Sequence, residues 1–229
     1  MNMKYLRILG NGLFFVGIFF GLALAVLSTW DKIEAINYYF TGATYAPFKG
    51  LRCPLVMTPS EQGTVSAIFD NPADEEDNFY YRAEISGMVE PRRIEDHILV
   101  APHGQQSIQW NVSEKDIDLE FFVFVKMTVL PNALHPTRQA TCGITVLNFH
   151  GLTGQQIFVI ALALSLLGMG LGLGIRQRTS PDKGYRLPIL AVVVLLAMLS
   201  GLIGWWLMGI IFIVIAILLL AIFVRMALA

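Results

Sequence analysis

The stretch Ile175-Arg-Gln-Arg-Thr-Ser-Pro-Asp-Lys-Gly-Tyr-Arg186 lies between two long apolar runs and orients every other segment of the chain. It carries four basic residues and a single acid, Asp182. Short loops rich in Lys and Arg between membrane spans belong on the cytoplasmic side. We therefore place residues 176–186 in the cytoplasm and expect both flanking runs to be transmembrane helices.

The composition is that of a membrane protein whose charge is sorted along the chain. Hydrophobic residues make up 55% of the sequence, charged residues only 14%, and the mean hydropathy is +0.60, which is unlike most soluble domains. Residues 31–153 contain 16 acidic and nine basic residues, whereas the rest contains one acidic and seven basic residues. This separation predicts an extracytoplasmic segment 31–153 and cytoplasmic termini in a plasma or inner membrane. The sequence has no basic stripe of the kind that binds nucleic acid.

Uncharged stretches predict four transmembrane helices. Segment 1–30 contains 22 uncharged residues from Ile8 to Thr29, more than the apolar core of a signal peptide, so we expect it to be retained as a helix. Segment 154–175 is the second span. Residues 187–224 carry no charge and would form a helix of about 57 Å, nearly twice the hydrocarbon thickness. The run 187–225 must therefore be a helical hairpin that turns within 200–209.

The segment between the first two spans has the pattern of a β-domain. Residues 31–52 are rich in aromatic side chains and predict a linker at the membrane interface. Residues 53–150 alternate apolar and polar side chains between turn clusters. The predicted fold class is therefore a membrane α + β protein: four transmembrane helices with an extracytoplasmic antiparallel β-sandwich of immunoglobulin-like architecture inserted between helices 1 and 2. The predicted strands are 53–57, 64–69, 79–85, 97–101, 106–112, 119–130 and 141–149.

Both cysteines of the chain, Cys53 and Cys142, fall in this outer segment. A disulfide between them would close a loop of roughly 90 residues and stabilise the fold by about 4–5 kcal/mol in the chain-entropy model. Two buried free thiols are the alternative that the spacing leaves open. A metal site is disfavoured because neither cysteine has neighbours at ligand spacing.

Small residues in two spans predict close helix packing. They are spaced four apart, so each pair lies on one helix face and lets a second backbone approach. We expect these faces to bind other helices, including those of other membrane subunits. The residues are Gly17 and Gly21 in the first span, and Gly168, Gly170, Gly172 and Gly174 in the second.

The sequence offers little for catalysis or for a cofactor. The interiors of the four predicted spans lack Asp, Glu, Lys, Arg and His, which proton relays, ion pathways and intramembrane catalysis use. We expect that the protein binds no cofactor and no metal and that it is not an enzyme. One acidic loop could hold calcium through carboxylate oxygens, but it lacks the glycine and spacing of a known calcium loop, and a solvated connector is the favoured interpretation. Its residues are Asp70, Asp74, Glu75, Glu76 and Asp77.

Two function classes follow, and an enzyme is the least supported third. The first is a non-enzymatic accessory or scaffold subunit whose outer β-sandwich binds or braces a partner. The second comes from the order of parts, which is similar to that of permease subunits of ABC systems that act mechanically on cell-envelope substrates. That resemblance covers topology only, because no motif matches. Claudin-like four-span proteins share the order, but their paired cysteines lie close together, unlike Cys53 and Cys142.

Overall fold

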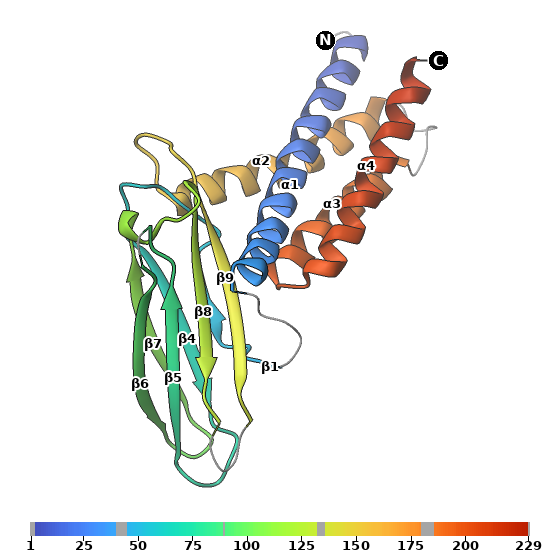
Figure 1. Cartoon of the computed structure of the whole chain (residues 1–229). Helices are drawn as coiled ribbons and strands as arrows, with labels where there is room; N and C mark the ends of the chain where they lie inside the picture. Colours follow the sequence, from blue (N-terminus) through green and yellow to red (C-terminus); the bar gives the residue numbers. More distant parts are fainter. Residues whose placement is uncertain (1–2, 40–44, 89, 132–135, 180–185, 229) are drawn as a thin grey trace. The chain divides into compact units, whose positions relative to one another are not determined.

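The computed structural model describes residues 3–39, 45–88, 90–131, 136–179 and 186–228, and the chain forms two compact units (Figure 1). The helical unit comprises Met1–Trp30 and Gln156–Ala229, and the β-unit comprises Asp31–Gln155. The described residues contain four helices, with all strands between the first and second of them. The helices are α1 (Met3–Tyr38), α2 (Gly154–Thr179), α3 (Arg186–Leu202) and α4 (Trp206–Leu228).

The β-unit contains two sheets. The larger has the order β1-β9-β8-β5-β6, with β3 also pairing with β9, and the smaller has the order β2-β4-β7. A short 3-10 helix, η1 (Glu114–Asp116), follows β7. The strands are β1 (Ala46–Pro47), β2 (Leu51–Arg52), β3 (Val56–Met57), β4 (Gly63–Asp70), β5 (Asp77–Ile85), β6 (Arg92–Val100), β7 (Gln105–Val112), β8 (Phe122–Val129) and β9 (Arg138–Val146).

Side-chain alternation explains how the two sheets share one core. Along β5, Phe79, Tyr81, Ala83 and Ile85 are buried while their neighbours are more exposed, because successive side chains of a strand point to opposite faces. Buried residues of both sheets form a single hydrophobic cluster. The β-unit is therefore a sandwich of two sheets.

Strand β8 departs from this alternation because both of its faces are covered. All of its residues except Lys126 are buried. Its inner face contributes to the shared core, while Phe122 and Phe124 pack on the other face against Ala35 and Tyr38 at the end of α1. The run Phe122–Val129 is consequently apolar almost throughout.

The predicted fold class is wrong as stated. The larger sheet is mixed, because β1 and β3 both pair with β9 in parallel, and only three described helices are long and apolar enough to cross a membrane. Helix α3, with 17 residues, spans about 26 Å, short of the hydrocarbon thickness. Alternation reveals that a segment is a strand and which face is buried, but it does not reveal the direction of the partner strand.

The predicted linker 31–52 begins as helix. Residues 31–38 are the last turns of α1, and they pack on β9 within the β-unit. The Thr145 hydroxyl donates to the Asp31 carboxylate, and the Lys32 ammonium donates to the Thr141 carbonyl. These contacts extend the helix past the charged residues that the sequence pattern took as its end.

In the helical unit, three helices, within Met3–Tyr38, Gly154–Thr179 and Trp206–Phe223, are long and apolar enough to cross a membrane, as expected of a membrane protein. Helices α3 and α4 form a hairpin. The turn is a Schellman motif: the Trp205 N–H donates to the Ser200 carbonyl and the Gly204 N–H to the Gly201 carbonyl, with Gly204 at φ +79°. Glycine adopts this left-handed conformation without strain. Part of the basic loop, 180–185 with Asp182 and Lys183, lies outside the described residues.

Candidate functional site

A crossover segment, residues 46–52, leads the chain from one sheet of the β-unit to the other. It begins as β1 on β9 and ends as β2 on β4. The Phe48 N–H donates to the Gln139 carbonyl (2.8 Å), and the Ile68 N–H donates to the Gly50 carbonyl (3.0 Å). A Cβ atom at Gly50 would overlap the Ile68 carbonyl oxygen, so the close approach requires glycine. The segment is thus held against both sheets.

An open cleft of about 470 Å³ lies beside the crossover segment, within the size range of ligand sites in proteins. Phe69 and Phe79 line it from the core, exposing only 1% and 3% of their surface, and Phe48 covers them from the crossover segment. The ring centroids are 5.3 Å apart for Phe48 and Phe69, and 5.7 Å apart for Phe69 and Phe79. Aromatic side chains of the core therefore lie behind the cleft, and polar and apolar residues share its lining.

Basic side chains outnumber acids in the lining of this cleft. Lys49, Arg52 and Arg138 line it together with one acid, Asp70, and the amide Gln105. Lys49 and Arg52 are exposed, and within the described part of the chain neither has an acid within salt-bridge distance or a side-chain hydrogen bond. An anion in the cleft would therefore meet Lys49 and Arg52, which have no such contact within the described residues.

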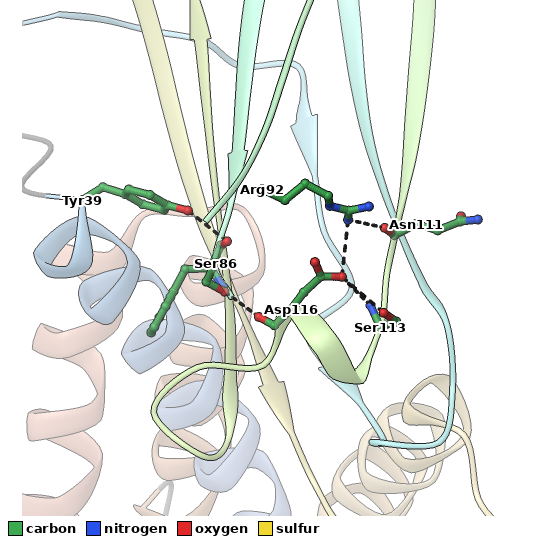
Figure 2. A network of polar contacts seen from close by, with 7 residues as sticks. Tyr39, Ser86, Arg92, Asn111, Ser113 and Asp116 are labelled. Carbon is green, nitrogen blue, oxygen red and sulfur yellow. Dashed lines mark hydrogen bonds and ion pairs between the residues drawn. The ribbon is translucent and has the colours of Figure 1, made fainter. Parts of the chain in front are cut away.

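A second group of polar residues, shown in Figure 2, holds the loop between β7 and β8 against the end of β5. The buried Ser86 hydroxyl donates to the Asp116 carbonyl (2.7 Å) and accepts from the Phe124 N–H (2.8 Å). The Asp116 carboxylate accepts from the Ser113 N–H (2.8 Å) and forms the capping box of η1. One serine thus serves two backbone groups that would otherwise be buried without partners.

Arg92 closes the outer side of this group. Its guanidinium donates to the Asn111 carbonyl (2.6 Å) and to the Asp116 carboxylate (3.3 Å). Asp116 is buried, whereas the Arg92 side chain is 45% exposed. The Asp116 carboxylate thus joins the start of η1 to Arg92 within the β-unit.

Tyr39, the residue that follows α1, is hydrogen-bonded to the same region. Its hydroxyl donates to the carbonyls of Glu84 (2.9 Å) and Phe124 (3.1 Å). Burial raises the pKa of the Tyr39 phenol well above its usual range, with smaller contributions from the nearby Tyr38, Glu84 and Asp118. The hydroxyl therefore stays protonated and remains a hydrogen-bond donor.

The two cysteines are joined as Cys53–Cys142, with 89 residues separating them in sequence. Cys142 lies in β9, and Cys53 follows β2 directly. The disulfide therefore connects the end of the crossover segment to the strand on which that segment begins.

The predicted acidic loop is divided between different surroundings. Asp70 ends β4 and lines the cleft, Asp77 begins β5 and is buried, and Asp74 lies 2.9 Å from the His103 ring. Glu75 and Glu76 are exposed. Across the residues that the structure describes, no three His, Cys, Asp or Glu side chains are grouped so as to hold a metal ion.

The glycines that were predicted to pack against other helices occupy two kinds of position in the helical unit, crowded and open. A Cβ atom on Gly168 would lie 2.8 Å from the Gly17 Cα atom, and one on Gly172 would lie 2.6 Å from the Phe14 nitrogen. Gly21 is equally crowded, by Val194 and Ser165. By contrast, a Cβ atom on Gly170 or Gly174 would meet no described atom within 4 Å. The face 168/172 thus packs on α1, and the face 170/174 has open space.

Sequence reasoning missed the cleft, because its basic residues come from positions 49, 52 and 138. The only signal available was that Lys49 and Arg52 stand close together in a segment dominated by acids. Their meeting with Arg138 depends on the pairing of β1 with β9, which local patterns do not specify.

No protein-family model and no curated relative matches the chain. Solved structures similar to part of it include a Paenibacillus sp. cycloisomaltooligosaccharide glucanotransferase, which is 13% identical over 44% of this chain and 14% of that chain, with a TM-score of 0.33. A Bacteroides uniformis β-glucuronidase is 13% identical over 42% and 12%, with a TM-score of 0.32. A Pseudomonas fluorescens alkylpurine DNA glycosylase is 13% identical over 53% and 35%, with a TM-score of 0.34.

This chain therefore spans about a third or less of the length of each of these proteins. At such identities and TM-scores, their activities say nothing about its function.

Proposed function

We propose that this protein is a non-enzymatic membrane subunit whose β-unit lies outside the cytosol and binds a protein partner through the cleft. The observation that carries the proposal is the contrast between two sets of polar groups. The Asp116 carboxylate is buried and bonded within the fold. Lys49 and Arg52, in contrast, are exposed at an aromatic cleft without an acidic partner in the described residues. A few exposed polar groups in a cleft that aromatic side chains also line are typical of a binding site.

The proposed location rests on charge and on the disulfide. Disulfides persist in oxidising compartments such as the periplasm or the cell exterior, which favours an extracytoplasmic β-unit around Cys53–Cys142. Arg176 and Arg178 at the end of α2, and Arg225 near the end of α4, favour a cytoplasmic position for those helix ends. Because α3 and α4 are joined as a hairpin, the beginning of α3 and the end of α4 would lie on the same side as the end of α2. Residues 31–153 would then face the outside, with both termini in the cytoplasm.

The helical unit adds a second contact surface to the proposal. The open face of α2 at Gly170 and Gly174 has room for a backbone to approach, and small residues on transmembrane helices favour such association. The protein would then join other membrane subunits through α2 and bind its outer partner through the β-unit.

Site-specific photo-crosslinking in native membranes tests the proposal. A benzophenone side chain placed at Arg52 in the cleft should give one major adduct, identified by mass spectrometry as a protein with an extracytoplasmic part. The same side chain at Ser107, an exposed residue of β7, is the matched control and should give none. Equal adducts from both positions, or no adduct from position 52, would refute the proposal.

A further inference from the structure

We infer that the cleft takes an acidic peptide segment of the partner, held by its carboxylate groups. This inference rests on the proposed function, because it takes the partner to be a protein. It goes further in naming the chemistry that the cleft recognises and the side chains that recognise it.

The charge of the cleft is opposite to that of its surroundings. The segment 31–153 contains 16 acidic and nine basic residues, yet three of those nine, Lys49, Arg52 and Arg138, line one cleft beside a single acid. A local positive site on an acidic unit directs an anionic ligand to that site and repels it elsewhere. The cleft is therefore where an acidic segment would bind.

The types of side chain favour carboxylate as the anion. Arg52 carries a planar guanidinium group, which matches the two oxygens of a carboxylate in paired hydrogen bonds, and Lys49 adds a second exposed positive charge to the lining. Behind them, the rings of Phe69 and Phe79 exclude water from one side of the cleft. The methylene groups of a glutamate side chain can lie on the partly exposed Phe48 ring, which packs over Phe69, and ion pairs formed beside this ring are stronger than in open water.

Asp70 and Gln105 favour a peptide over a phosphate group. They lie opposite each other in the β4–β7 register and both line the cleft. A carboxylate at this position repels a doubly charged phosphate more than a singly charged carboxylate, and the backbone N–H groups of a peptide can donate hydrogen bonds to the Asp70 carboxylate and to the Gln105 side-chain carbonyl. The lining thus supplies acceptors as well as donors, as a peptide backbone requires.

Binding of fluorescein-labelled hexaglutamate to the purified full-length chain in detergent, followed by fluorescence anisotropy, tests the inference. Lys49→Gln should weaken binding about tenfold, the loss expected for one charge-assisted hydrogen bond. Lys115→Gln removes the same charge from another exposed lysine of the β-unit and should leave binding unchanged. Asp70→Asn should tighten binding, a gain that misfolding cannot produce.

Other outcomes would overturn the inference. One is an equal loss of hexaglutamate affinity in Lys49→Gln and Lys115→Gln. A second is binding of hexaglutamine as tight as that of hexaglutamate. A third is stronger displacement of the probe by inorganic phosphate than by glutarate at equal concentration. Preference for phosphatidylglycerol vesicles over hexaglutamate would likewise assign the cleft to lipid.

The two proposals fail in different ways. If the crosslinker at position 52 captures a protein while hexaglutamate binding ignores Lys49, the acidic-peptide inference is wrong and the proposed function stands. If hexaglutamate binding depends on Lys49 but position 52 captures no protein, the proposed function is wrong.

Discussion

At the scale of single residues, Ser86 has more effect on the fold than its size suggests. Its hydroxyl is the hydrogen-bond partner of both the Phe124 N–H and the Asp116 carbonyl. Ser86→Ala should leave both groups without that partner and destabilise the β-unit by about 2–6 kcal/mol, since each of the two unsatisfied buried groups costs about 1–3 kcal/mol. Thermal unfolding of the purified chain, followed by circular dichroism, should show a lower midpoint.

Ser107→Ala is the matched control for this change. Ser107 is exposed on β7, so its loss should move the midpoint little. Equal midpoints for the two variants would contradict the structural role assigned to Ser86.

Individual residues also show how far the sequence could predict the fold. The burial of Phe79, Tyr81, Ala83 and Ile85 follows the alternation of apolar and polar side chains along the predicted strand 79–85, because a two-residue period identifies the buried side of a strand. The role of Ser86 could not be predicted, because its partners lie 30 and 38 positions away. Nothing in a local pattern says which distant backbone group a buried hydroxyl will reach.

At the scale of elements, the two faces of α2 should respond differently when a glycine is replaced by a large side chain. Gly172→Leu should disrupt the packing of α1 on α2, because even a Cβ atom there would lie 2.6 Å from the Phe14 nitrogen. Gly170→Leu should leave the fold of the helical unit intact, because its side has open space. Gel filtration of the detergent-solubilised variants and their thermal midpoints measure the difference.

Substitution at Ile210, on α4, gives a further comparison for this prediction. Ile210 is exposed, so Ile210→Leu should behave like wild type. If Gly172→Leu were as stable and monodisperse as Gly170→Leu, the close contact between α1 and α2 would not matter for the fold.

The same scale shows why some elements were missed. The long strands β4, β5 and β7 follow the predicted segments within a few residues, because each has several periods of alternation. Strands β1 and β2 have only two residues each, too few to show a period. The extension of α1 beyond Asp31 is stabilised by contacts with β9, which are tertiary and leave no helical signal in the sequence.

The disulfide acts at the scale of the whole β-unit. Because it closes a loop of about 90 residues, replacing both cysteines in Cys53→Ala/Cys142→Ala should cost about 4–5 kcal/mol in the chain-entropy model. Dithiothreitol should lower the unfolding midpoint of the wild type to about that of the double variant. It should leave the midpoint of the double variant unchanged. A midpoint that reductant leaves unchanged in the wild type would contradict this stabilising role.

The proposed orientation of the whole molecule is tested with single cysteines in the Cys53→Ala/Cys142→Ala background. Ser107→Cys, on the β-unit, should react with a membrane-impermeant maleimide on intact cells. Gln177→Cys, exposed near the end of α2, should react only after the membrane is permeabilised. Labelling in the opposite pattern would reverse the orientation.

Strand β9 has a consequence for how this protein is made. It pairs with β1, β3 and β8, so two strands from the beginning of the β-unit have no partner until a segment about 90 residues later has left the ribosome. Contacts that far apart slow the closing of a sheet, and the waiting strands present unpaired backbone to other chains. Until its final strand is delivered, the nascent β-unit is therefore most exposed to mispairing, and a chaperone that acts at that stage would protect these edges.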